Sequence, residues 1–155
     1  MELEVEMLMH AARSGSTHVL EELSDVDFNQ KDSKGDTALI LASKYHQPDM
    51  VKLLIEKGAN VNEADDEGNS ALMWAAFTGN VAIAEPLIKN NANLNQQRAD
   101  GATALMLAIM AGQSDLVKLL LVAGADTEVC NGLGLRALDL AQQQGNTEVL
   151  ALLEA

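Results

Sequence analysis

The sequence predicts an all-helical fold built as a solenoid, in which five short helix-turn-helix units stack side by side. Four glycines recur at equal spacing, and each is followed by a leucine four positions later and by an alanine seven positions later. They are Gly35, Gly68, Gly101 and Gly134. An internal period of this length is typical of stacked copies of one supersecondary unit. Apolar residues make up 48% of the chain and aromatic residues only 3%, as expected where thin helices pack closely.

The first unit, over about residues 1–31, is predicted to cap the N-terminal end of the array. Its two helices align at residues 8–15 and 19–23. Gly15 stands closer to His46 than His46 stands to Gly79, so this unit is slightly shorter than the repeat. A stacked array needs terminal units whose outer faces tolerate water, and the acidic start of the chain suits that place.

The three central units, 32–64, 65–97 and 98–130, are each predicted to contain two helices because their apolar residues recur at helical spacing. Thr37, Ser70 and Thr103 precede the first helix of their units. A hydroxyl at this position accepts a hydrogen bond from an otherwise unpaired amide of the first turn, so each is a predicted N-cap.

Glycines are predicted to end these helices because a left-handed residue satisfies the leftover carbonyls without steric cost. Gly79, Gly112 and Gly145 follow first helices, and Gly58 and Gly124 follow second helices. His46 and Asn91 stand in the same columns. His and Asn are enriched among non-glycine residues at positive φ, so the same backbone is expected there.

The last unit, 131–155, is predicted to be the C-terminal cap. Arg136 stands where the other units have a capping hydroxyl, and the second apolar run is shorter, over residues 150–153. Both features indicate a divergent terminal unit, and the glutamines at 142–144 suit an end that faces water.

The four copies resemble the ankyrin repeat, whose signature reads roughly Asp-x-x-Gly-x-Thr-Pro-Leu-His-x-Ala. Asp32 and Asp65 fit the opening aspartate, while Arg98 and Asn131 replace it. The resemblance covers nearly all of residues 1–155 as one domain, and it implies a β-turn finger before each helix pair. Alanine replaces the proline in all four copies and none keeps the histidine, which predicts looser fingers. The residues in the histidine column are Ile40, Met73, Met106 and Asp139.

Composition and charge restrict the classes of partner. The formal charge is −13, which disfavours phosphate backbones and favours a basic protein partner. The alternative interpretation of this charge is that it only solvates the surface and does not select a partner. The single cysteine, Cys130, and the lack of a long apolar run predict a soluble, monomeric, cytoplasmic protein that does not enter membranes, although an effector delivered into another cell fits equally.

No constellation of residues predicts catalysis, a cofactor or a metal. His10, His18 and His46 fall on different helices, and no His or Cys cluster has metal-ligand spacing. The glycines do not form a phosphate-binding loop after a strand. The sequence therefore predicts a chain that is not an enzyme and that binds protein.

The candidate site is the concave face that stacking creates from the fingers and the exposed sides of the first helices. Tyr45, Phe77 and Met110 are expected at its centre, because aromatic and large apolar anchors dominate interface energetics. Packing between units is the alternative role for these three. An acidic rim of Asp66, Glu67 and Asp100 is expected to face Lys or Arg of the partner. The complete predicted set is Lys44, Tyr45, Asp66, Glu67, Asn69, Phe77, Thr78, Asp100 and Met110.

Two further positions stand out. Trp74 is expected to fill the core, because its counterparts in register are Leu41, Leu107 and Leu140. Pro86 falls inside the second helix of the third unit, where it removes an amide and crowds the carbonyl of Ala82, so a kink is expected. A soft point in the array is one hypothesis for this proline, and a tolerated kink is the other.

The function predicted from these observations is a non-catalytic protein-binding module. An inhibitor or immunity-type protein that occludes one partner is an alternative, and a scaffold that bridges two proteins is another. These alternatives differ in valency, because an inhibitor forms a tight one-to-one complex and a scaffold holds two partners at once.

Overall fold

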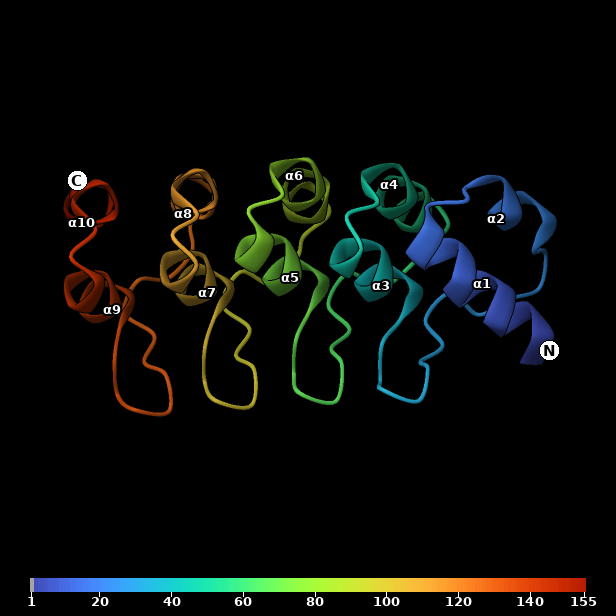
Figure 1. The fold of residues 1–155 in the computed structure, drawn as a ribbon, viewed down its shortest axis with the longest axis horizontal. Helices are drawn as coiled ribbons and strands as arrows, with labels where there is room; N and C mark the ends of the chain where they lie inside the picture. The colour runs from blue at the N-terminus through green and yellow to red at the C-terminus, as the bar shows by residue number, and fades with distance from the viewer. Residues whose placement is uncertain (1) are drawn as a thin grey trace.

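The computed structural model describes residues 2–155, and within them the chain forms ten α-helices in five consecutive pairs (Figure 1). The helices are α1 Glu2–Ser14, α2 His18–Glu22, α3 Ala38–Lys44, α4 Pro48–Glu56, α5 Ala71–Thr78, α6 Val81–Lys89, α7 Ala104–Met110, α8 Ser114–Ala123, α9 Ala137–Gln144 and α10 Thr147–Glu154. No strand forms across this range, where one isolated β-bridge joins Ala64 and Ser70.

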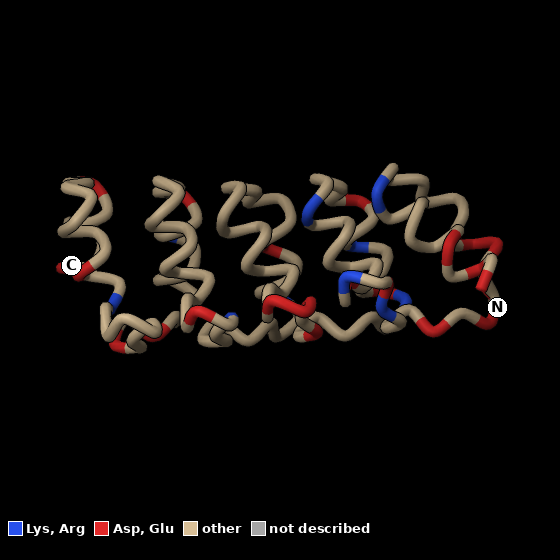
Figure 2. Tube along the Cα trace, turned by 60° about the horizontal axis from the view of Figure 1, so that its bottom comes forward, with Lys and Arg blue, Asp and Glu red and all other residues tan. Residues whose placement is uncertain are grey.

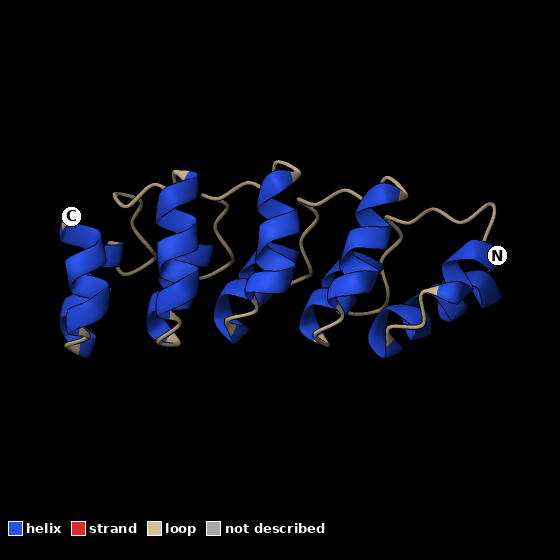
Figure 3. Ribbon diagram, turned by 90° about the horizontal axis from the view of Figure 1, so that it is seen from above, coloured by secondary structure: helices blue, strands red, loops and turns tan. Residues whose placement is uncertain are grey.

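The helices form two layers. The odd-numbered helices make an inner row from which long loops project, and the even-numbered helices make an outer row (Figure 1). Figure 3 shows the outer helices lying side by side. The principal contacts join helices of the same unit or of adjacent units. The predicted all-helical solenoid is therefore confirmed.

The core is a thin layer that repeats with the chain. Leu39, Leu72 and Leu105 occupy one column of the inner helices, and all three are fully buried. The outer helices contribute a second buried column, made of Leu54, Leu87 and Leu120. Burying one leucine side chain stabilises a fold by about 2 kcal/mol, so the units contribute similar amounts of stability.

The predicted N-caps are confirmed. The side chains of Thr37, Ser70 and Thr103 accept hydrogen bonds from backbone amides three residues later, at 3.2, 3.3 and 3.3 Å. α9 begins differently, because the Asp139 carboxylate accepts the backbone N–H of Arg136 at 2.8 Å. This hydrogen bond lowers the pKa of Asp139.

The left-handed helix ends are also confirmed. Gly79 and Gly145 end α5 and α9 with φ of 75° and 66°. His46 and Asn91 adopt φ of 60° and 66°, which are the backbone conformations of their glycine counterparts. Their side chains are thus tolerated at positions that the repeat reserves for glycine.

Four fingers project from the inner layer at residues 32–36, 65–69, 98–102 and 131–135, and each closes with the same two backbone hydrogen bonds. Adjacent fingers are also joined through the backbone. Ala99 N–H donates to Glu67 O at 3.0 Å, and Gly132 N–H donates to Asp100 O at 2.9 Å. The missing histidine therefore does not leave neighbouring fingers unconnected.

A ladder of asparagines connects the loops that follow the outer helices. The side-chain carbonyls of Asn29, Asn62 and Asn95 accept backbone amides of the next unit at 2.7, 2.7 and 2.8 Å. Each side chain thus reaches from its own unit to the one that follows. The ladder therefore fixes the register of neighbouring units on the side away from the core.

α1 and α6 each have a local feature that the other helices of their layer lack. α1 begins at Glu2, so the acidic start of the chain is part of the longest helix of the described residues. α6 continues through Pro86 from Val81 to Lys89, so the proline does not break the helix. Ala82, whose carbonyl loses its amide partner there, is exposed.

Candidate protein-binding face

The four fingers and the C-terminal turns of the inner helices form one continuous surface, which we call the finger face. Figure 2 shows that Lys and Arg lie mainly toward its N-terminal end, whereas Asp and Glu lie along its whole length. Of the predicted site residues, Tyr45, Asp66, Glu67, Phe77, Asp100 and Met110 are exposed, Lys44 and Thr78 are half-buried, and Asn69 is buried.

Phe77 and Met110 are the apolar residues that the finger face presents at the ends of α5 and α7. They are 51% and 53% exposed, and Tyr45 is 50% exposed. About half of each side chain thus remains open to solvent, so these side chains are not consumed by packing between units. Groups of this size are well suited to anchor a contact with another macromolecule.

Tyr45 does not share the repeat column of Phe77 and Met110. Phe77 and Met110 are separated by one full repeat, and the residue one full repeat before Phe77 is Lys44. Tyr45 therefore belongs to the column of Thr78. One residue turns a helix by about 100°, so the two columns point in different directions.

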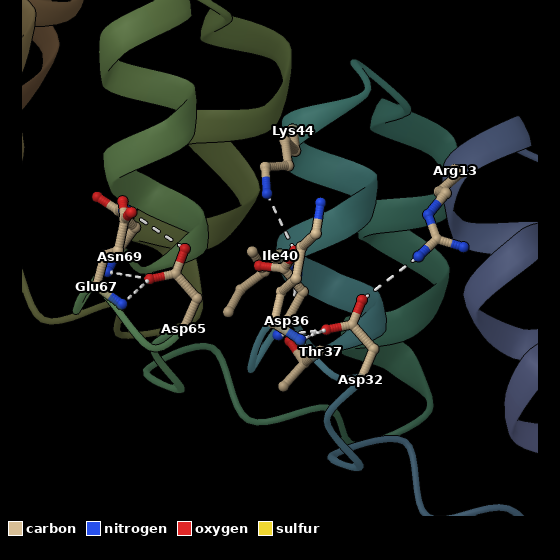
Figure 4. Close-up of polar contacts among 10 residues, drawn as sticks. Arg13, Asp32, Asp36, Thr37, Ile40, Lys44, Asp65, Glu67 and Asn69 are labelled. Atoms are coloured by element: carbon tan, nitrogen blue, oxygen red, sulfur yellow. Dashed lines mark hydrogen bonds and ion pairs between the residues drawn. The ribbon is translucent and has the colours of Figure 1, made fainter.

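Lys44 contacts one residue of its own unit and one of the next, and its ion pair with Asp36 is shown in Figure 4. Its Nζ lies 3.0 Å from Asp36 Oδ2 and 4.8 Å from the centroid of the Trp74 ring. Asp36 is only 1% exposed. Burial raises the pKa of this carboxyl, and the hydrogen bond from Lys44 opposes that shift. One unit earlier, Arg13 Nη2 lies 3.4 Å from Asp32 Oδ2.

Asn69 is not part of the exposed surface, which corrects its place in the predicted site. It is 4% exposed, its Nδ2 donates to Asp65 Oδ2 at 3.2 Å, and its Oδ1 accepts from Arg98 Nη1 at 3.1 Å. Asp36 and Ala102 stand in the same column and are also buried. This finger position turns toward the inner helix, so its side chain holds the finger in place.

Thr78 is also engaged by its own helix. Its hydroxyl donates to the Trp74 carbonyl at 2.8 Å, and the side chain is half-buried. The hydroxyl of this predicted site residue is therefore already paired within α5.

Trp74 does not fill the core as its position predicts. Its counterparts Leu41, Leu107 and Leu140 are buried, whereas the larger indole is half-buried and forms a wall between two hollows of the finger face. The hollow toward the 32–36 finger has a volume of about 510 Å³. The pocket toward the 98–102 finger has a volume of about 120 Å³.

The smaller pocket contains residues that sequence reasoning missed. It is lined by Asn69, Met73, Trp74, Phe77, Arg98 and Leu107. The available signal was the size of Trp74 in a column of leucines, because an indole cannot occupy the volume of a leucine side chain without displacing its neighbours.

The three residues of the predicted acidic rim, Asp66, Glu67 and Asp100, are exposed on the fingers. Asp100 Oδ1 lies 3.2 Å from Arg98 Nε, which compensates part of its charge. Within residues 2–155, neither Asp66 nor Glu67 forms an ion pair. These two uncompensated carboxylates line the same hollow as Trp74.

Among residues 2–155, no three His, Cys, Asp or Glu side chains gather in a way that could hold a metal ion. No helix in the same range is both long and apolar enough to cross a membrane. The side chains of the finger face that line hollows are the apolar and charged groups around Trp74.

Comparison with known proteins agrees with the repeat pattern. A family model described as ankyrin repeats, in three copies, matches residues 8–98 and 86–154. The two matches together extend over nearly the whole chain and include all four fingers. In the comparison with curated proteins, nothing matches this chain.

Proposed function

The chain belongs to the ankyrin-repeat family, and on that premise we propose that it is a non-catalytic module that binds a basic protein through the finger face. Ankyrin repeats generally mediate protein-protein interactions. The observation that carries the proposal is the pairing of two half-exposed apolar side chains, Phe77 and Met110, with the uncompensated carboxylates of Asp66 and Glu67.

The rigidity of the surrounding structure supports this proposal. Phe77 belongs to the last turn of α5, and Gln113 Nε2 of the next unit donates to its carbonyl at 3.3 Å. Gln144 Nε2 donates to the Met110 carbonyl in the same way at 2.9 Å. Side chains on preorganised helix ends lose little conformational freedom when they bind, so more of the contact energy appears as affinity.

The charge of the face supports a basic partner. Asp66 and Glu67 are adjacent on an exposed fingertip, and the chain as a whole carries a formal charge of −13. Such a distribution accelerates association with a positively charged protein and repels an acidic one. The effect is screened over about 8 Å at physiological ionic strength, so affinity should fall as salt is added.

Affinity capture with the full chain tests the proposal. The double variant Phe77→Ala/Met110→Ala removes both anchors from exposed positions, and Leu3→Ala removes an exposed apolar group from α1. We expect proteins that the wild type and Leu3→Ala retain and that the double variant loses. Equal recovery by all three chains would exclude the finger face as the binding surface.

A one-to-one inhibitor or immunity-type role is the more specific form of this proposal. Such a protein forms a tight complex whose association slows steeply with salt. Stoichiometry and salt dependence measured on a captured partner separate this role from a weaker, exchangeable interaction.

A scaffold role is the second candidate, and the outer layer supports it. Val81, Leu119 and Val122 line a hollow of about 360 Å³ on α6 and α8, together with Glu85, Asp115 and Lys118. Val122 is 81% exposed there. A scaffold holds one protein on the finger face and another on this hollow. A ternary complex that Val122→Asp reduces to a binary one would support this role.

A further inference from the structure

We infer that the two hollows beside Trp74 bind an extended peptide segment in which an aliphatic side chain is next to, or one residue away from, a lysine or arginine. The inference rests on the proposed function and specifies the chemistry of the partner. It depends on the unequal character of the two hollows and on the single indole that separates them.

The smaller pocket suits an aliphatic side chain. Met73, Trp74, Phe77 and Leu107 supply apolar walls around a volume of about 120 Å³. One water occupies about 30 Å³ in the liquid, so the pocket holds roughly four waters, which matches the four carbons of a leucine or isoleucine side chain. Displacing water from such walls is favourable for an apolar group.

Of the polar side chains that line this pocket, Arg98 and Asn69 are paired with each other, whereas the buried Nε1 of Trp74 has no hydrogen-bond partner among residues 2–155. Arg98 Nη1 donates to Asn69 Oδ1 at 3.1 Å, and Arg98 Nε lies 3.2 Å from Asp100 Oδ1. A polar side chain entering the pocket would have to compete with these contacts. The apolar walls supplied by Met73, Phe77 and Leu107 therefore favour an apolar occupant.

The larger hollow suits a cation. Lys44 and Asp36, both in its lining, neutralise each other at 3.0 Å. The remaining charged groups of the lining are three carboxylates and one amine, from Asp65, Asp66, Glu67 and Lys34. A lysine or arginine of a partner would be attracted to this excess of negative charge, while a carboxylate would be repelled.

Trp74 sets the distance between the two bound groups because its ring borders both hollows. Residues of an extended peptide advance by about 3.3 Å each, so neighbouring positions of one segment reach the two sides of an indole. The chain has a single tryptophan, and its emission therefore reports occupancy of either hollow directly.

A selection from a random peptide library displayed on phage, with the immobilised full chain as bait, tests the inference. We expect enriched peptides to carry leucine, isoleucine or methionine within two residues of lysine or arginine. Synthetic copies of the enriched peptides should shift the Trp74 emission at saturating concentration. Enrichment of acidic peptides, or of peptides without an aliphatic residue, would overturn the inference.

Variants of the two hollows separate their contributions. Phe77→Ala should weaken the selected peptides by about 20-fold or more, because truncating a central aromatic anchor has this effect at interfaces. Glu67→Lys should weaken them by about tenfold and reduce the salt dependence of binding. Leu3→Ala and Glu56→Lys, which make matched changes at exposed positions of α1 and α4, should leave affinity within about twofold.

Trp74→Leu is the variant least expected to disturb folding, because leucine is the residue of this column in the other units. This variant should remain folded by circular dichroism and lose the selected peptides. Binding that survives in Trp74→Leu, Phe77→Ala and Glu67→Lys would overturn the inference. If no peptide is enriched, the inference fails while protein capture by the finger face decides the proposed function separately.

Discussion

Residues 32–44 and residues 98–110 form the same finger and the same inner helix, and Thr37 and Thr103 cap α3 and α7 in the same way. Their surfaces are different. In the second unit Asp32 accepts two finger amides at 2.9 Å, and Lys44 pairs with Asp36. In the fourth unit these three columns contain Arg98, Met110 and Ala102.

The two units have the same backbone conformation but different surface side chains. Caps and left-handed glycines determine the path of the chain in both units. In the second unit Lys44 is paired with Asp36, whereas its counterpart in the fourth unit, Met110, is half-exposed. The same column therefore presents a paired charge in one unit and an apolar surface in the other. The experiments below test this difference, beginning with the largest expected effect.

The fourth-unit finger should tolerate a methyl group least. Gly101 has φ of 84°, and a Cβ there would lie 2.5 Å from Gly132 N. We expect Gly101→Ala to lower the free energy of unfolding by about 3 kcal/mol, because left-handed strain and a backbone clash add. Gly134→Ala, at φ of 76° with open space around it, should cost about 1 kcal/mol.

Gly35 provides the comparison with the second unit, because a Cβ there meets the flexible side chain of Asp66 first. Its substitution by alanine should fall between the two. Urea unfolding followed by circular dichroism measures all three. Equal losses for Gly101→Ala and Gly134→Ala would show that contact between fingers contributes little.

Asp32 should be more important for stability than its counterpart Arg98. Asp32→Ala removes two hydrogen bonds to a carboxylate and the contact with Arg13, so we expect a loss of about 2 kcal/mol in the free energy of unfolding. Arg98→Ala removes one hydrogen bond to Asn69 and the ion pair with the exposed Asp100, and it should cost about 1 kcal/mol or less because an exposed ion pair contributes little. The reverse order, measured in the same unfolding assay, would contradict the proposed difference between the two fingers.

Lys44→Met gives the second unit the surface of the fourth and should make stability more dependent on pH. The pKa of Asp36 is raised from 3.8 by burial, and Lys44 opposes this shift. A raised folded-state pKa contributes stability that is complete below 3.8 and is lost as pH rises through the folded value. Without Lys44 this loss is greater, so we expect a cost of about 1 kcal/mol at neutral pH.

The double variant Lys44→Met/Asp36→Ala is the control, since it removes the buried carboxyl as well. Its unfolding free energy should change less with pH than that of either the wild type or Lys44→Met. Unfolding measured at several pH values above 3.8 distinguishes the three chains. A parallel pH dependence in all three would show that Asp36 is not the titrating group.

The smallest difference is expected at the N-caps. Thr37→Ala and Thr103→Ala should each cost about 1 kcal/mol, because each removes one hydrogen bond to the first turn of an inner helix. The two losses should agree within about 0.5 kcal/mol, since the cap distances are 3.2 and 3.3 Å. A larger difference between the two losses in unfolding free energy would mean that the two caps do not contribute equally to stability.

The features that could be predicted from the sequence are those that depend on local chemistry. The caps at Thr37 and Ser70 and the positive φ of His46 and Asn91 follow from the preferences of single residues. The constant spacing of the repeat then determined the order of the units. The same spacing places Lys44, and not the aromatic Tyr45, in the repeat column of Phe77.

The features that could not be predicted depend on neighbouring units. Asn69 is buried because Arg98 of the next finger reaches it, and Trp74 is only partly buried because the space around its column is shaped for leucine. The ladder through Asn62 likewise pairs a side chain with a backbone amide of the following unit. Pairing of this kind is set by how units stack, and residue preferences within one unit carry no information about it.

Each repeat unit contacts mainly the units beside it. The chain should therefore unfold one unit at a time when it is stretched. Pulled from its two ends, it should lengthen in steps, each releasing one period such as the stretch from Gly68 to Gly101. An extended residue spans about 3.4 Å, so one period corresponds to a contour length of about 11 nm. Between these steps the remaining units stay folded. When the force is released, unfolded units should refold against the units that are still folded.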